Sequence, residues 1–232
     1  MGFPQKRKIK ITKLKTKAYQ RNLLIGFSIS TMKEQFWNER YAQEEFAYGE
    51  NPNSFLIEQL TQFSPGKALM ICEGEGRNAV FVAKNNWSVD AFDISEEGEN
   101  KAILLASKHN VSLNYFIGDA NKINFETNNY DLIVSIFAHF PKSERKSIHQ
   151  KMIQWLKPGG LILLEAFNPK QITNQSGGPK DESMLYTIEM LQSDFQELNI
   201  VKLENAETDL DEGIYHKGKA DVIRFLGFKN LM

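Results

Sequence analysis

The hydrophobic pattern from residue 67 onward alternates between short apolar runs and longer segments with the spacing of helices. An apolar run of four to six residues that ends at a turn is typical of a buried parallel strand. The alternation predicts one α/β domain with a doubly wound, mostly parallel sheet covered on both faces. The predicted strands are 68–72, 88–92, 113–117, 130–135, 161–165, 200–203 and 221–227, and the predicted helices are 78–83, 96–109, 143–156 and 187–198.

The last two predicted strands break this alternation. No helical pattern separates 200–203 from 221–227, and the residues between them, 204–219, are polar. Strands that follow one another without a crossover helix pair in antiparallel fashion. We therefore expect a C-terminal antiparallel hairpin at the edge of the seven-stranded sheet.

The N-terminal segment differs from the rest in both pattern and charge. Residues 1–31 show no sustained helical or strand period, and we interpret them as a basic, disordered extension of a domain that spans residues 32–232. Residues 1–21 contain eight basic and no acidic side chains. Removing them leaves 20 basic against 29 acidic side chains, so the formal charge of −1 for the whole chain becomes −9 for residues 22–232. An acidic body disfavours a nucleic-acid partner.

Composition also bounds the compartment. The single cysteine, Cys72, excludes an internal disulfide framework and fits a reducing environment. No apolar run approaches the roughly 20 residues of a membrane-spanning helix, and the apolar stretch 23–27 is shorter than that of a signal peptide. We expect a cytoplasmic protein without a membrane partner, as a monomer or weak homodimer.

Two features at the ends of the first two strands point to a ligand. Gly74-Glu75-Gly76 follows the first strand, where glycine permits a tight turn and close approach of a ligand to the backbone. With Ala79 it satisfies the dinucleotide fingerprint, a weak signal because a purely structural turn is the alternative. Asp93 ends the second strand, where an acid can accept the hydroxyl protons of a ribose or merely cap a helix. Together the two features favour a nucleoside-containing cofactor.

The charge of the glycine loop indicates which kind of cofactor the loop binds. Glu73 and Glu75 flank the first glycine. A diphosphate favours helix amides without nearby anions, whereas carboxylates attract an ammonium or sulfonium group. We expect one of the two side chains, Glu75, to point to solvent.

These residues resemble a known family. The stretch from Leu69 to Ala79, LMICEGEGRNA, is similar to motif I of the class I S-adenosylmethionine-dependent methyltransferases, in the form found in small-molecule enzymes related to tellurite-resistance and thiopurine methyltransferases. The resemblance continues through Asp93, the stretch 118–120 and the stretch 156–160, and covers about residues 34–228. It implies a Rossmann-like fold, S-adenosyl-L-methionine as cofactor and methyl transfer to a small-molecule acceptor.

The resemblance also implies residue roles. The glycine backbone would face the methionine portion of the cofactor, Asp93 the ribose diol, and Asp119 with Ala120 the adenine. The family usually has an acid where Met70 stands and a glycine where Cys72 stands, so Glu73 is our substitute for the contact with the amino group. The implied cofactor-binding residues are Glu73, Gly74, Gly76, Asp93, Ile94, Asp119, Ala120 and Phe137.

On the substrate side, His139 follows the fourth strand and is the candidate catalytic residue, to orient or deprotonate an acceptor; a loop histidine without a catalytic duty is the alternative. A thiol, chalcogen oxyanion or similar soft nucleophile would need little help from a base. The candidates to line the substrate pocket or its lid are Arg40, Tyr48, Glu165 and His216. No His, Cys, Asp or Glu pair has metal-ligand spacing, so we expect no metal.

Competing functions remain open at this point. The glycine fingerprint also fits a nucleotide-dependent oxidoreductase, and Met70 with Cys72 in motif I fits a non-catalytic module that binds S-adenosylmethionine. A nucleic-acid methyltransferase is disfavoured by the acidic body and by Phe137-Ala138-His139-Phe140 after the fourth strand, where an Asn-Pro-Pro-aromatic motif would stand.

Overall fold

The computed structural model describes residues 31–231. The expected extension, residues 1–31, lies outside the described residues except for Thr31, and its state stays a prediction. Within the described range, seven strands form one sheet in the order β3-β2-β1-β4-β5-β7-β6. The strands are β1 (Lys67–Ile71), β2 (Ser88–Asp93), β3 (Asn114–Ile117), β4 (Tyr130–Ile136), β5 (Leu156–Phe167), β6 (Leu198–Glu212) and β7 (His216–Lys229).

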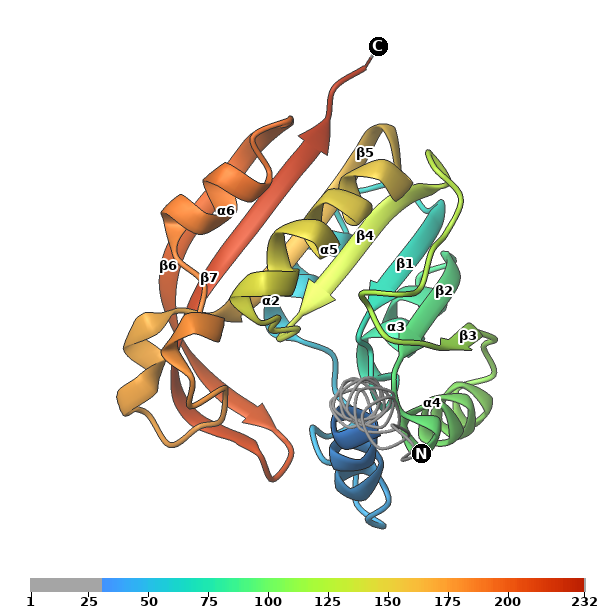
Figure 1. Cartoon of the computed structure of the whole chain (residues 1–232). Helices are drawn as coiled ribbons and strands as arrows, with labels where there is room; N and C mark the ends of the chain where they lie inside the picture. The colour runs from blue at the N-terminus through green and yellow to red at the C-terminus, as the bar shows by residue number, and fades with distance from the viewer. Residues whose placement is uncertain (1–30, 232) are drawn as a thin grey trace, which may run out of the picture.

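The pairing of the strands confirms the expected topology. β3, β2, β1, β4 and β5 pair in parallel, and β7 lies antiparallel to both β5 and β6. The doubly wound, mostly parallel sheet with a C-terminal antiparallel hairpin is therefore confirmed. The parallel strands all end at the same edge of the sheet, which faces downward in Figure 1.

Helices cover both faces of the sheet (Figure 1). On one face, apolar side chains of α5 and α6 pack against alternate residues of the central strands, including Leu69, Ile71 and Ile133. On the other face, α2 and α3 pack against the intervening residues, including Met70 and Val134. The helices are α2 (Ser54–Leu60), α3 (Arg77–Lys84), α4 (Glu96–Lys108), α5 (Lys142–Trp155) and α6 (Ile188–Asp194), with 3-10 turns at Pro169–Thr173 and Glu182–Met184 and a further helical segment at residues 31–41.

Several boundaries differ from the sequence-based prediction. The polar stretch 204–219 is not a loop, because β6 and β7 continue through it to a turn at 213–215. One face of this extension is covered, since Leu210 and Ala220 pack with Leu185 and Phe167. α2 was not predicted, α6 ends before Leu198, and β5 begins already at Leu156.

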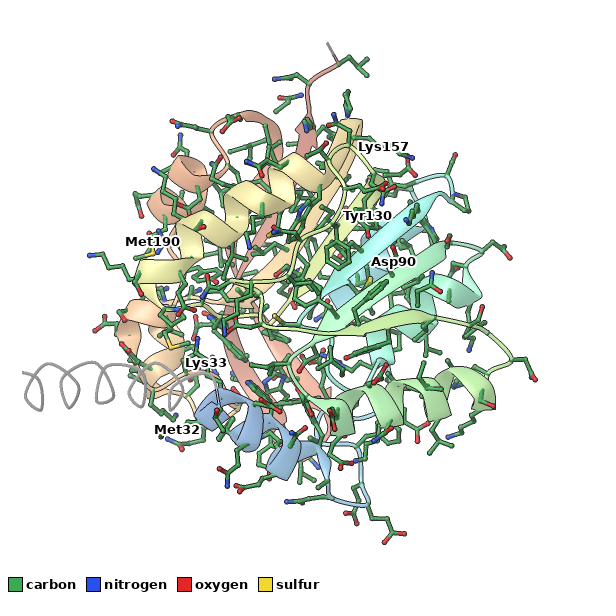
Figure 2. All side chains as sticks on the ribbon, turned by 45° about the vertical axis from the view of Figure 1, so that its right-hand side comes forward. Met32, Lys33, Asp90, Tyr130, Lys157 and Met190 are labelled. Atoms are coloured by element: carbon green, nitrogen blue, oxygen red, sulfur yellow. The ribbon has the colours of Figure 1, made fainter. Side chains whose placement is uncertain are left out.

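The amino ends of the strands are tied by a polar cluster far from the glycine loop. The Tyr130 hydroxyl donates to Asp90 Oδ2 at 2.8 Å, and Lys67 Nζ lies 3.1 Å from the same oxygen. Tyr130 and Asp90 point toward one another from neighbouring parts of the sheet in Figure 2. This cluster braces the edge of the sheet that carries no candidate site residue.

A second polar cluster joins the hairpin to the rest of the fold. Asn53 Nδ2 donates to Glu165 Oε1 at 2.7 Å and to Glu212 Oε1 at 3.2 Å. Arg224 Nε donates to Glu165 Oε2 at 2.6 Å, and Arg77 NH2 to Glu212 Oε2 at 2.8 Å. Buried carboxylates are stable only when paired and hydrogen-bonded. We call these five residues the buried junction.

We predict that Asn53→Asp lowers the free energy of unfolding by about 3 kcal/mol or more, because it replaces the shared donor with a third buried carboxylate. Urea titration followed by circular dichroism measures this loss. The matched control, Asn100→Asp on the exposed side of α4, is expected to change stability by no more than about 0.5 kcal/mol. Equal stability of the two variants would contradict the role of the junction.

Candidate cofactor and acceptor site

Strained backbone marks the carboxyl edge of the sheet. Cys72 directly follows β1 with φ 50°, and Phe137 directly follows β4 with φ 53°. The other three non-glycine residues with positive φ in residues 31–231 are asparagines, which adopt this conformation readily. A left-handed cysteine or phenylalanine costs on the order of 1–3 kcal/mol, and such strain clusters at functional sites. The two central strands thus both end in strained residues at this edge.

The glycine loop is packed by tyrosines on both sides. The Tyr115 hydroxyl donates to the carbonyl oxygen of Gly74 at 2.6 Å. A Cβ at Gly74, φ +60°, would lie 2.5 Å from the Tyr41 hydroxyl, and one at Gly76, φ +86°, would lie 2.6 Å from the Cβ of Ala102. Both glycines are therefore required by the packing and conformation of the turn itself, whatever they contact in a ligand.

Glu73 caps the helix that follows the loop. Its Oε1 accepts hydrogen bonds from the backbone N–H groups of Asn78 at 2.9 Å and Ala79 at 2.7 Å. A carboxylate at this position satisfies amides that have no partner within the helix and interacts favourably with the helix dipole. Glu73 Oε2 has no hydrogen-bond partner among the described residues and remains available to a ligand.

Asp93 holds the loop against the next helix. Its Oδ2 accepts from Gly74 N at 3.1 Å, and its Oδ1 accepts from Ser95 N at 3.0 Å. Ser95 in turn caps α4, with Oγ accepting from Gly98 N at 3.1 Å. A carboxylate has about four acceptor sites, so both oxygens of Asp93 retain capacity for a ribose diol.

Neither Glu73 nor Asp93 forms an ion pair within residues 31–231, although the charge of Arg77 acts on Glu73 and lowers its pKa against the larger effect of burial. No Lys, Arg or His nitrogen lies within 4.0 Å of either carboxylate in the described part of the chain. Burial raises the pKa of Glu73 to about 7 and that of Asp93 to about 6. A bound ligand with positive charge would compensate these carboxylates, and this donor set fits a sulfonium or ammonium group better than a diphosphate.

Glu75 behaves differently from its neighbour, and the expectation that it points to solvent is wrong. Its side chain is buried, with Oε1 2.9 Å from Lys101 Nζ on α4. Its Oε2 accepts a longer hydrogen bond, 3.4 Å, from Tyr48 N. The lysine lies two turns into α4, so sequence spacing alone gives no signal of this pair.

Met70 stands where the resembling family carries an acid. Its side chain is fully buried in the apolar cluster formed with α2 and α3. It therefore contributes to the core and presents no polar group to the site. The adenine side of the expected site lies farther along the edge, where Ile94 follows Asp93 and the Asp119–Ala120 turn follows β3.

The helical segment 31–41 lies across the carboxyl edge. Its Asn38 Oδ1 accepts from Ser95 Oγ at 2.6 Å, at the start of α4. Its Lys33 Nζ lies 2.9 Å from Glu144 Oε2, in the first turn of α5. Figure 2 shows Lys33 at the end of this helix that is nearer to α5. The segment thus bridges α4 and α5 above the strand ends, as a lid would.

Three of the four residues expected to line the pocket or lid come together. Arg40 NH1 donates to the Tyr48 hydroxyl at 2.9 Å, and its guanidinium lies 4.1 Å from the ring centre of Tyr215. The rings of Tyr48 and His216 lie 4.5 Å apart. This group, which we call the aromatic mouth, also includes Phe137 and Phe167, whose rings stack at 4.5 Å.

Glu165 does not join the aromatic mouth. It is 0% exposed, and both of its oxygens are bound within the buried junction, to Asn53 and Arg224. Its position at the end of β5 correctly indicates proximity to the carboxyl edge. Its partners come from residues far away in the sequence, so its structural role has no local signal.

His139 has both ring nitrogens bound to the backbone. Nδ1 lies 2.7 Å from the carbonyl oxygen of Met184, and Nε2 accepts from Phe167 N at 3.1 Å. A carbonyl only accepts, so the proton is on Nδ1. Burial lowers the pKa of His139 to about 4. In this arrangement no nitrogen is left to take a proton from a substrate, which corresponds to the alternative of a loop histidine without a catalytic duty.

Some residues of the site were not singled out in the sequence. Tyr115 and the tight packing of Tyr41 against Gly74 have no motif that reveals them. Asn53 does have a signal, because its Oδ1 accepts from Leu56 N and caps α2, an Asn-Ser start that sequence rules recognise.

Residues 31–231 contain no group of three or more His, Cys, Asp or Glu side chains that could hold a metal. Within the same range, no helix has the length and apolar character of a membrane span.

Part of the chain matches a known protein family. Residues 68–160 match the family model of a methyltransferase domain. A comparison with curated proteins found no match. The matched range begins in β1 and ends within β5, so it contains the glycine loop, Asp93 and Phe137.

Solved structures share the fold of this chain. One is a structure from work on the conversion of a disulfide bond into a thioacetal group during echinomycin biosynthesis. It superposes with a TM-score of 0.72 at 12% identity, covering 87% of this chain and 92% of that one. TehB from Haemophilus influenzae gives 0.64 at 20% identity, covering 85% and 67%. The N-methyltransferase NodS from Bradyrhizobium japonicum WM9, in complex with S-adenosylhomocysteine, gives 0.66 at 13% identity, covering 84% and 97%.

These findings confirm the expected resemblance to class I S-adenosylmethionine-dependent methyltransferases. The tellurite-resistance resemblance has its counterpart in TehB. The roles of the individual site residues and the identity of the acceptor stay predictions.

The two glutamates of the glycine loop provide a matched test of the electrostatic assignment. In the unfolded chain Glu73 loses its proton near pH 4.5, whereas in the folded chain it holds the proton to about pH 7. The carboxyl therefore lowers the stability of the free protein progressively as pH rises through this window. Glu73→Gln keeps an oxygen to cap α3 and removes the uncompensated charge.

We predict that Glu73→Gln raises the melting temperature of the ligand-free protein at pH 8 and leaves it unchanged at pH 4.5, while it weakens binding of S-adenosylmethionine. Glu75→Gln, which removes the carboxylate paired with Lys101 and leaves the lysine only the carbonyl oxygen of Glu45, is expected to lower the melting temperature. Differential scanning calorimetry at both pH values measures the difference. A fall in melting temperature for both variants at pH 8 would count against an uncompensated charge at Glu73.

Proposed function

We propose that this protein is an S-adenosylmethionine-dependent methyltransferase that acts on a small-molecule acceptor. The observation that carries the proposal is the pair of carboxylates that form no ion pair with a described residue, the half-buried Glu73 and the buried Asp93, at the glycine loop of the segment that matches a methyltransferase domain. The cofactor supplies an electrophilic methyl group and brings the positive charge that these carboxylates lack. The same carboxylates disfavour the diphosphate of an oxidoreductase cofactor.

In this proposal, different residues of the carboxyl edge bind different parts of the cofactor. The backbone of the glycine loop and Glu73 hold the methionine portion, and Asp93 holds the ribose diol. The adenine lies against Ile94, Asp119 and Ala120, and Phe137 adjoins the reacting methyl group. Methyl transfer from a sulfonium is an in-line displacement, so positioning and exclusion of water supply much of the catalysis.

The acceptor side is supported by the aromatic mouth. Phe137, Phe167, Tyr48 and Tyr215 bring four aromatic rings to one end of the sheet, and Arg40 lies against them. Rings of this kind bind flat, apolar molecules. The formal charge of −9 for residues 22–232 supports a small molecule over a nucleic acid as the acceptor.

Ligand-dependent melting tests the proposal. We predict that S-adenosylhomocysteine raises the melting temperature of the protein and NAD does not. Asp93→Asn is expected to weaken S-adenosylhomocysteine about 10- to 100-fold by calorimetric titration, because it removes a charged acceptor from the ribose.

The matched control is Asp131→Asn, at the opposite edge of the sheet beside Lys157, which is expected to leave the affinity unchanged. Stabilisation by NAD without stabilisation by S-adenosylhomocysteine would refute the proposed function in favour of an oxidoreductase. Unchanged affinity in Asp93→Asn would remove Asp93 from the site, and an equal loss in both variants would show that the effect is not specific to Asp93.

A further inference from the structure

His216 lies at the tip of the β6–β7 hairpin, inside the aromatic mouth. It is the first residue of β7 and is 6% exposed. Its ring centre lies 4.5 Å from Tyr48, 4.7 Å from Phe137 and 5.3 Å from Phe167. Phe137 is the residue that directly follows β4, so the imidazole lies beside the position proposed for the reacting methyl group.

One nitrogen of His216 is held by a carboxylate. Nδ1 lies 3.4 Å from Glu212 Oε2, and the carboxylate can only accept. Arg77 binds the same oxygen and lowers, with His216, the pKa of Glu212 to about 2. Glu212 is therefore ionised, and it fixes the proton of the neutral imidazole on Nδ1.

The other nitrogen of His216, Nε2, is left as an acceptor without a partner. No hydrogen bond reaches it from the described residues, and it is not among their fully enclosed polar atoms. A Cβ at Gly177, φ +107°, would lie 3.1 Å from Nε2 and 2.6 Å from Cδ2. Gly177 thus packs closely against this edge of the ring, and any larger residue there would cover Nε2 with its side chain.

The two histidines beside Phe167 differ in this respect. His139 has both nitrogens bound to the backbone, whereas His216 has one bound to a carboxylate and one free. A histidine oriented by a carboxylate, with its second nitrogen facing the reacting groups, is the arrangement of a general base. Only His216 has it.

We propose that His216 is the general base of the methyl transfer, and that the acceptor is a flat aromatic molecule with a phenolic hydroxyl or an aromatic amine. This inference rests on the proposed function and specifies its acceptor. It replaces the expected soft nucleophile, because a thiolate or chalcogen oxyanion has no proton to lose and would make no use of a free imidazole nitrogen. It also transfers the catalytic role expected for His139 to His216.

In this step the methyl group and one proton change places. The acceptor's oxygen or nitrogen forms a bond to the methyl carbon while the carbon–sulfur bond breaks, and the electron pair of that bond remains on sulfur. The acceptor's proton passes to His216 Nε2. The resulting imidazolium is paired with the Glu212 carboxylate, whose other neighbours, Arg77 and Asn53, keep it in place.

The charges around His216 are compatible with a neutral base near pH 7. Burial lowers its pKa, Glu212 raises it, and Arg77 and Arg40 lower it further. Tyr48 and His139 face the same ring, and neither carries a charge at neutral pH, since burial raises the pKa of the tyrosine and lowers that of the histidine. The imidazole is thus free to accept a proton before the acceptor is methylated.

The test compares acceptors that differ only in whether they carry a proton. The probes are 4-methylphenol, 4-methylaniline and 4-nitrothiophenol, the last ionised at neutral pH, each assayed with S-adenosylmethionine and the full chain. His216→Asn keeps a donor at the position of Nδ1 and removes Nε2. We predict that it lowers kcat for the phenol or the aniline by about 100-fold or more, and leaves the affinity for S-adenosylhomocysteine unchanged.

His109→Asn, at the end of α4, is the control and is expected to leave every rate unchanged. A second readout is independent of activity: long-range nitrogen–proton NMR of the free protein should show His216 as the Nδ1–H form with an unprotonated Nε2. Glu212→Gln should abolish this preference.

Each outcome of these assays either supports or overturns the role of His216. Methylation of the phenol or the aniline that depends on His216 supports the proposal. Methylation that survives in His216→Asn, transfer to the thiolate alone, or no transfer to any probe although S-adenosylhomocysteine binds, overturns it. Failure of S-adenosylhomocysteine to bind the unmodified protein refutes the proposed function instead.

Discussion

The buried junction is the interaction on which the arrangement of this protein depends. Two glutamates, Glu165 on β5 and Glu212 on β6, lie 0% and 8% exposed, and neither could remain charged there without Asn53, Arg77 and Arg224. These five residues come from the segment before α2, the start of α3 and three strands. By satisfying the junction, the chain places the hairpin tip over the ends of the parallel strands. The hairpin is thereby fixed as one wall of the site.

The same edge of the sheet contains two other carboxylates, which form no ion pair in the described part of the chain. Glu73 and Asp93 are bound by backbone amides alone, and burial raises the pKa of both. Burial of these charges lowers the stability of the free protein. In the proposed function the positive charge of the bound cofactor offsets this cost. Glu165 and Glu212 are each bound by an arginine, whereas Glu73 and Asp93 accept only from backbone amides, so the carboxylates that hold the structure differ in their partners from those that we assign to the ligand.

Local sequence was sufficient for the parts of the fold whose signals are local. The apolar runs that became β1, β2 and β4, and the acid at the end of β2, follow from residues within a few positions of one another. Glu165 and Glu75 were assigned to the wrong surroundings because their partners, Arg224 and Lys101, lie 59 and 26 residues away. The length of the hairpin was missed for the same reason, since its polar extension is stabilised by Leu185 and Phe167. Long-range charge pairing and packing leave no period in the sequence.

The hairpin and the loops contribute different parts of the chemistry. The loops after β1 and β2 lie in the segment that matches a methyltransferase domain, and we assign to them the binding of the methyl donor. The residue we assign to the acceptor, His216, lies outside residues 68–160, as do Glu212 and the glycine that leaves room beside it. The matched segment holds neither the histidine nor its carboxylate, so a protein could share the domain and methylate another class of acceptor. The acceptor is therefore to be sought in the hairpin and in what Glu212 does to His216, whereas the cofactor follows from the domain.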